Sequence, residues 1–82
     1  MALDVKYGGS AANTPVITWP RHCESNQRWK LEKCGSEFIL TSQTGSNLVL
    51  DVLDVESDKT VIVNSKNNSD SQLWELVEHE SI

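Results

Sequence analysis

Three short sequence patterns occur twice in this chain, in the same order, and they favour a fold built from two copies of one unit. The first pattern recurs 47 residues later, and the other two recur 45 residues later. A two-residue gap after the aspartate aligns all three, which indicates an internal duplication. The patterns are Leu-Asp-Val (3–5 and 50–52), Val-Ile (16–17 and 61–62) and Gln-x-Trp-x-Leu (27–31 and 72–76).

The spacing of apolar residues predicts an all-β chain. Trp29 and Leu31 alternate with polar neighbours, as in a half-buried strand. Pro20 is expected to end the preceding strand because it has no N–H to donate. Clusters of Gly, Ser and Asn predict turns, and residues 53–59, with Asp54, Glu56 and Asp58, predict an acidic loop. We expect seven short strands, at residues 3–5, 16–19, 27–32, 38–42, 48–52, 61–63 and 73–77.

The size and charge of the chain suit one small domain over residues 1–82, with a first copy at residues 2–34 and a second at residues 35–82. The chain has 82 residues and a formal net charge of −5. Its basic residues are scattered, so we do not expect nucleic-acid binding, which needs clustered positive charge. No apolar run is long enough for membrane insertion. No signal peptide is visible at the N-terminus, which slightly favours a cytoplasmic location.

No residue pattern predicts a metal site or catalysis. Cys23 and Cys34 have no further Cys or His at ligand spacing, so we expect neither a metal nor another cofactor. Without an export signal, two free thiols are favoured over a disulfide. His22 and Cys23 are adjacent in sequence, which is too close to indicate a catalytic dyad. We therefore expect a protein that is not an enzyme.

The repeated patterns, together with Pro-Val-Ile-Thr-Trp-Pro (15–20), resemble the ricin B-type lectins, the (QxW) β-trefoil family. The resemblance covers nearly the whole chain and both Gln-x-Trp motifs. It implies a β-trefoil-like fold. Trp29 and Trp74 are expected to be core residues first, because a large aromatic side chain buries much apolar area.

A trefoil of this family has three repeats of four strands, whereas this chain is expected to have seven strands. Nothing before Ala2 matches residues 37–41, which open the second copy. The chain could be one piece of a cut protein, or its fold could close differently. We expect instead an incomplete trefoil whose missing strands another chain supplies, in a homo- or hetero-oligomer, because open strand edges invite association.

In this family a sugar binds in a shallow pocket within one repeat, and the first copy keeps the matching residues. The resemblance assigns sugar hydroxyls to Asp4 and Asn26, and the apolar face of the sugar ring to Trp19, with Gln27 behind them. His22, in the loop beside Trp19, could reach the sugar or simply lie at the surface. A carboxylate, an amide and an aromatic plane match the hydroxyls and the C–H face of a pyranose.

These residues also have structural interpretations. Asp4 could cap a turn, Trp19 could pack in the interior or at a partner interface, and Asn26 could be a turn residue. Ile17 stands where many relatives have a glutamine, which removes one hydrogen-bonding group. The joint presence of the others in the family's order favours sugar binding.

The second copy keeps fewer of these residues. Asp51 remains, but Asn64 replaces the aromatic residue and Ser71 replaces Asn26. The stacking plane is therefore missing. We expect a degenerate second site at Asp51, Asn64 and Gln72, in which Asp51 is structural or idle.

The sequence thus predicts a carbohydrate-binding lectin subunit. By family analogy, its first copy binds a sugar of the galactose or N-acetylgalactosamine type. The alternative is a non-catalytic protein-binding or assembly subunit, like trefoils that serve as inhibitors or adaptors, with Trp19 as an interface anchor.

Overall fold

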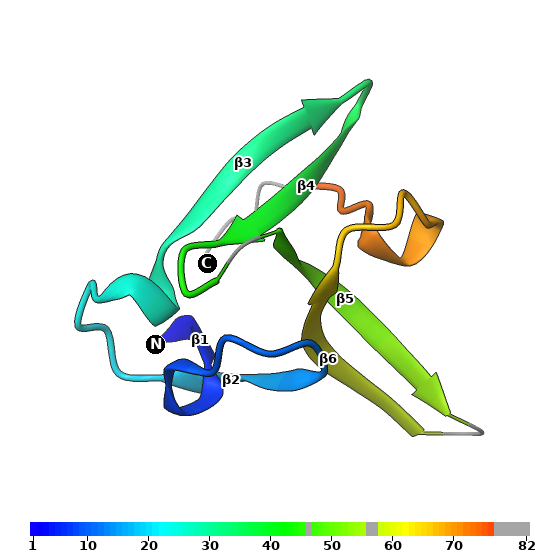
Figure 1. The fold of residues 1–82 in the computed structure, drawn as a ribbon. Coiled ribbons are helices and arrows are strands. Elements are labelled where there is room, and N and C mark those ends of the chain that lie inside the picture. Colours follow the sequence, from blue (N-terminus) through cyan, green and yellow to red (C-terminus); the bar gives the residue numbers. More distant parts are fainter. Residues whose placement is uncertain (46, 56–57, 77–82) are drawn as a thin grey trace, which may run out of the picture.

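Six antiparallel strands form one sheet, in the order β1-β2-β6-β5-β4-β3, in this computed structural model, which describes residues 1–45, 47–55 and 58–76 (Figure 1). Three 3-10 helices accompany them: η1 (Lys6–Gly8), η2 (Ser25–Gln27) and η3 (Asp70–Gln72). None of the helices in the described ranges is long and apolar enough to cross a membrane. The strands are β1 (Ala2–Val5), β2 (Thr14–Trp19), β3 (Trp29–Cys34), β4 (Glu37–Ser42), β5 (Leu48–Val55) and β6 (Asp58–Ser65).

Three hairpins make up the sheet. The β1–β2, β3–β4 and β5–β6 hairpins contain four, six and eight residue pairs, whereas β2–β6 and β4–β5 are joined by two pairs and one pair. Figure 1 shows the β3–β4 and β5–β6 hairpins diverging to different sides of the molecule. Gly35 opens the turn between β3 and β4 with a φ of 64°, a left-handed conformation that glycine adopts without strain.

The apolar core lies where strands of all three hairpins meet. Val5 of β1, Leu48 of β5 and Val63 of β6 form a buried cluster, against which Val16 and Trp29 pack. Burying an aliphatic side chain of this size contributes about 1.5–3 kcal/mol to stability. Every buried side-chain nitrogen or oxygen in the described part of the chain has a hydrogen-bond partner, as expected of a well-formed interior.

The tryptophans of the two Gln-x-Trp motifs make the same contact in each copy. Trp29 Nε1 donates to the carbonyl of Leu3 at 3.2 Å, and Trp74 Nε1 donates to the carbonyl of Leu50 at 2.9 Å. Both side chains are half-buried, and Trp29 packs against the core cluster. Each indole therefore fastens the end of its own motif to the Leu-Asp-Val strand of the same copy.

Two predicted boundaries in the second copy differ from the structure. The acidic loop predicted at residues 53–59 is wrong for most of its length, because β5 runs on to Val55 and β6 begins at Asp58. Asp54 and Lys59 pair across this hairpin with exposed side chains, so their charges do not oppose strand formation. Glu56 lies outside the described residues.

The strands that include the Gln-x-Trp motifs also differ from prediction. Strand β3 begins at Trp29 rather than at residue 27, because Gln27 ends η2 and turns its amide toward the preceding loop. Of the strand predicted at residues 73–77, Trp74 forms a bridge with Phe38, and Val77 lies outside the described residues.

Candidate functional site

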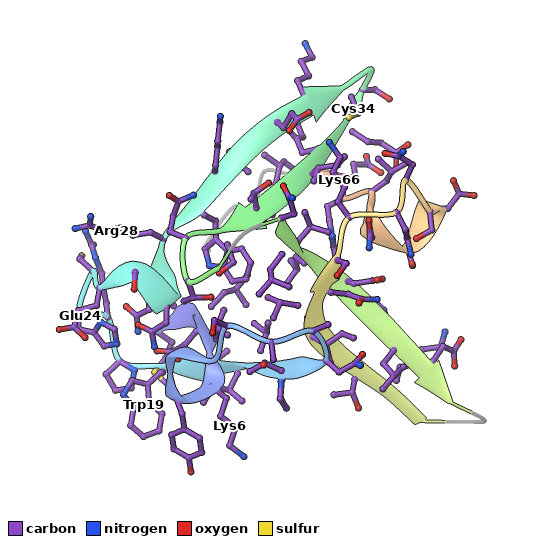
Figure 2. The ribbon with its side chains drawn as sticks, viewed as in Figure 1. Lys6, Trp19, Glu24, Arg28, Cys34 and Lys66 are labelled. Atoms are coloured by element: carbon purple, nitrogen blue, oxygen red, sulfur yellow. The ribbon has the colours of Figure 1, made fainter. Side chains whose placement is uncertain are left out.

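A pocket of about 200 Å³ opens in the first copy, between the β1–β2 hairpin and the loop that leads into η2. Figure 2 shows the side chain of Trp19 projecting outward from this part of the molecule. The structure brings four of the five predicted first-copy residues together around the pocket, while Gln27 lies behind them. The lining residues are Asp4, Tyr7, Ile17, Trp19, His22 and Asn26.

Asp4 forms the inner end of the pocket and is almost completely buried. Its residue is 3% exposed, so the carboxylate needs hydrogen-bond donors in place of water. Asn26 Nδ2 donates to its Oδ1 and Gln27 Nε2 donates to its Oδ2, both at 2.9 Å. Asn26 and Gln27, which lie three and two residues before Trp29, therefore hold the Asp4 carboxylate in one orientation.

Gln27 positions the loop around the pocket rather than lining it. Besides Asp4, its Nε2 donates to the carbonyl of Pro20 at 3.0 Å. Its Oε1 accepts from the backbone N–H groups of His22, at 2.8 Å, and Cys23, at 3.3 Å. One amide thus satisfies three backbone groups of a loop with no regular secondary structure.

His22 covers the outer side of the Asp4 carboxylate. Its Nε2 lies 3.3 Å from Asp4 Oδ2. Its Nδ1 accepts a hydrogen bond from the backbone N–H of Glu24 at 3.1 Å. When the ring is neutral, that bond places the proton on Nε2, the nitrogen that faces Asp4 Oδ2.

Trp19 supplies an accessible aromatic surface. It is the last residue of β2, Pro20 follows it, and the residue is 53% exposed. Pro20 cannot continue the strand ladder, so the chain turns away at this point. The indole is therefore not part of the interior and is available to a ligand.

Tyr7 is a pocket residue that the sequence analysis missed. It lies in η1, at the start of a Gly-, Ser- and Asn-rich segment for which the sequence predicts only turns. The available signal was an aromatic residue directly before Gly8 and Gly9, where no strand or helix pattern explains it.

The residues of the predicted second site also come together, but they bind one another. Asp51 Oδ2 accepts from Asn64 Nδ2 at 3.2 Å and from Gln72 Nε2 at 3.1 Å, and Oδ1 accepts from the backbone N–H of Val52 at 2.7 Å. Gln72 is fully buried and also donates to the carbonyl of Ser65 at 2.8 Å. This arrangement gives Asp51 a structural role.

The ionisation of Asp51 reflects this environment. Burial favours the neutral acid, but hydrogen bonds from Ser71, Gln72, the Val52 N–H and Asn64 together outweigh burial and lower the pKa of the carboxyl below its ordinary value. Asp51 is therefore a buried, ionised and hydrogen-bonded carboxylate at neutral pH.

Potential metal ligands are dispersed in the described part of the chain, where no three His, Cys, Asp or Glu side chains gather around a common point. Cys23 and Cys34 are free thiols, the first exposed and the second half-buried. Cys23 Sγ accepts a hydrogen bond from Arg21 Nε at 3.5 Å.

Comparison with known proteins identifies the architecture. A family model described as "Ricin-type beta-trefoil lectin domain" matches residues 1–81. The chain is similar to the crystal structure of a designed 3-fold symmetric protein, ThreeFoil, with a TM-score of 0.83 and 29% sequence identity over 94% of this chain. The match covers 56% of the ThreeFoil chain, so this chain spans a little over half of that protein. No curated protein matches the sequence.

These comparisons confirm two predictions made from the sequence. The resemblance drawn from the repeated motifs names the same family as the family model. The all-β, incomplete trefoil is confirmed by the six described strands and by the structural neighbour, of which the chain covers only part.

Proposed function

We propose that this chain, which belongs to the ricin-type beta-trefoil lectin domain family, binds a sugar of the galactose or N-acetylgalactosamine type in the pocket of its first copy. Membership in a lectin family supports carbohydrate binding, and this family is non-catalytic. The observation that carries the proposal is the convergence of Asp4, Asn26 and an exposed Trp19 on one pocket. The sugar class is argued by analogy within the family.

Each side chain has a defined task in this proposal. The Asp4 carboxylate accepts hydrogen bonds from neighbouring sugar hydroxyls, and charge-assisted bonds of this kind are about twice as strong as neutral ones. The Asn26 amide contacts a hydroxyl from the side. The Trp19 indole packs on the C–H face of the ring. Gln27 fixes the orientation of Asp4 before the ligand arrives, which lowers the entropy lost on binding.

His22 controls access to Asp4. The Asp4 side chain is nearly covered, and His22 Nε2 is its contact on the pocket side. A sugar hydroxyl therefore takes the place of Nε2 at Asp4 Oδ2, and the displaced ring lies beside the ligand as a further hydrogen-bonding group.

Replacing Trp19 with alanine tests this proposal. We expect Trp19→Ala to weaken binding of methyl β-galactoside or N-acetylgalactosamine at least tenfold, because a stacking contact of about 1.5 kcal/mol or more is lost. Trp19→Phe should retain part of the affinity. Calorimetric titration measures both, and Leu53→Ala, at an exposed apolar residue on β5, is the matched control.

Two results would contradict the sugar proposal. The first is the absence of any galactoside response, in solution and on a glycan array, from protein of verified assembly. The second is a Trp19→Ala variant that loses its assembly instead of its sugar binding. That result would favour the alternative, a protein-binding subunit anchored by Trp19.

We also propose that the sheet is completed by strands of a second chain. In the described residues, β1 and β3 each pair with one neighbour only. Leu3 on β1 is 41% exposed and Leu31 on β3 is 52% exposed, so both edge strands present apolar side chains. The chain spans only 56% of the similar trefoil. Exposed apolar edges of this kind promote strand pairing between chains.

The native mass of the 82-residue chain tests the assembly. Light scattering should give a multiple of 9.2 kDa. Leu31→Lys should lower that mass, because a charge on an edge strand opposes pairing, whereas Leu53→Lys should not. A 9.2 kDa monomer that unfolds cooperatively would refute the proposal.

A further inference from the structure

Tyr7 has an unusual combination of backbone conformation and exposure. Its φ of 56° and ψ of 22° lie in the left-handed region, and the residue is 94% exposed. Bulky residues are rare in this conformation, and the strain persists where surrounding structure imposes it, often at ligand sites. A ring with so little contact contributes little to the core. Its contribution therefore lies at the pocket that it lines.

The turn that carries Tyr7 is fixed to the rest of the molecule. The N–H of Gly9 donates to the carbonyl of Lys6 at 3.1 Å, and Thr44 Oγ1 donates to the carbonyl of Gly9 at 3.0 Å. Gly9 also lies so close to Thr14 that a Cβ would come within 2.6 Å of its side chain. Tyr7 is thus presented by an anchored backbone, which limits the entropy lost when a ligand binds.

Exposure orders the pocket from its inner end to its rim. Asp4 is 3% exposed, Trp19 is 53% exposed and Tyr7 is 94% exposed. A ligand unit that reaches Asp4 and stacks on Trp19 therefore meets Tyr7 on its solvent side. Lys6 Nζ lies 5.4 Å from the centroid of the Tyr7 ring and adds a hydrogen-bond donor beside it.

We propose that Tyr7 forms an outer subsite for a second pyranose, linked to the sugar that binds at Asp4 and Trp19. The preferred ligand is then an oligosaccharide rather than a single sugar. This inference rests on the proposed function of the first copy. The second copy has Asp54 at the equivalent position, on a continuous strand β5, so the two-aromatic arrangement belongs to the first copy.

The test compares three probes: methyl β-galactoside, lactose and p-nitrophenyl β-galactoside. The native chain should bind lactose up to about tenfold more tightly than methyl β-galactoside, as one aromatic contact allows. In Tyr7→Ala and Tyr7→Gly this ratio should fall toward one, and in Tyr7→Phe it should remain. A gain for the p-nitrophenyl compound without a gain for lactose would overturn the second-pyranose assignment in favour of an aryl group.

The outcomes separate this inference from the proposed function. Binding of methyl β-galactoside and lactose with equal affinity, unchanged by the Tyr7 variants, overturns the outer subsite and leaves the sugar site intact. Failure of all three probes and of N-acetylgalactosamine to bind overturns both.

Thermal unfolding gives a second readout. Glycine adopts the left-handed conformation freely, so Tyr7→Gly should keep or raise the melting temperature while the lactose preference is lost. A Tyr7→Gly variant that melts much earlier would show that Tyr7 is a structural residue, and would overturn the inference.

Discussion

The glutamine of each Gln-x-Trp motif binds the aspartate of its own copy, and the copies differ in what else that aspartate contacts. Gln27 joins Asp4 to the carbonyl of Pro20, and Gln72 joins Asp51 to the carbonyl of Ser65. In the first copy Asn26 donates to the aspartate from η2, and a histidine lies 3.3 Å from it on the pocket side. In the second copy an asparagine amide donates to the carboxylate from the adjacent strand.

This difference shows how the arrangement of aspartate, glutamine and tryptophan that both copies share can either line a pocket or support the fold. Residue 19 of β2 is a tryptophan that points to solvent, whereas its counterpart on β6, Asn64, turns inward to the carboxylate. At this position the first copy has an aromatic residue that lines a pocket, whereas the second copy has a hydrogen-bond donor to its aspartate. The contacts that both copies share are those made by the glutamine, the aspartate and the tryptophan.

The largest expected effect is the loss of the buried glutamine. Gln72→Ala should lower the free energy of unfolding by about 3 kcal/mol, because it removes one donor from the buried Asp51 carboxylate and the Gln72 partner from two backbone groups, the Ser65 carbonyl and the Asn67 N–H. Gln27→Ala should cost about 1 kcal/mol, since water reaches its partners in the pocket loop. Urea unfolding measures both, with the exposed Gln43→Ala as control. Equal losses would show that the copies do not differ in burial.

A graft of first-copy residues onto the second copy should have an intermediate effect. The double variant Asn64→Trp with Ser71→Asn restores the stacking surface and the side amide, and removes the inward bond to Asp51. We expect at least tenfold stronger binding at the second copy, or about 1.4 kcal/mol. The titration should then give two sugars per chain, while Asn64→Ala with Ser71→Ala should give one. If the grafted variant binds only one sugar per chain, the difference in sugar binding between the two copies lies outside positions 64 and 71.

The smallest expected effect is on the acid sensitivity of the fold. The pKa of Asp51 is lower in the folded chain than its ordinary value. Its contribution to stability is therefore present above the unfolded pKa, about 3.9, and is lost as the pH falls through the lower folded pKa. Asp51→Asn should be less stable at pH 7 and should lose less stability on acidification below about pH 4. Urea midpoints across this range check the difference, and identical acid dependence in both proteins would exclude Asp51 as its source.

The repeated motifs and the family that they resemble were enough to predict the fold and the proximity of Asp4, Trp19 and Asn26, because each of these residues has a fixed place in the family's pattern. His22 was placed near them only by its position in the loop after Trp19. Tyr7 could not be predicted, since its position depends on a left-handed turn that tertiary contacts of Gly9 hold in place. Residue patterns near it indicate only a loop.

The extension of β5 and β6 was also beyond the sequence. The charges at residues 54 and 59 are typical of a solvated loop, yet the two-stranded hairpin also leaves these two side chains exposed. Composition alone does not separate these two arrangements, because backbone pairing decides between them.

Both carboxylate networks take the partners described here from within their own copy. The residues of one network can therefore be substituted without removing a hydrogen-bond partner from the other. After a duplication, such independence allows one copy to become purely structural while the other copy acquires or changes a ligand.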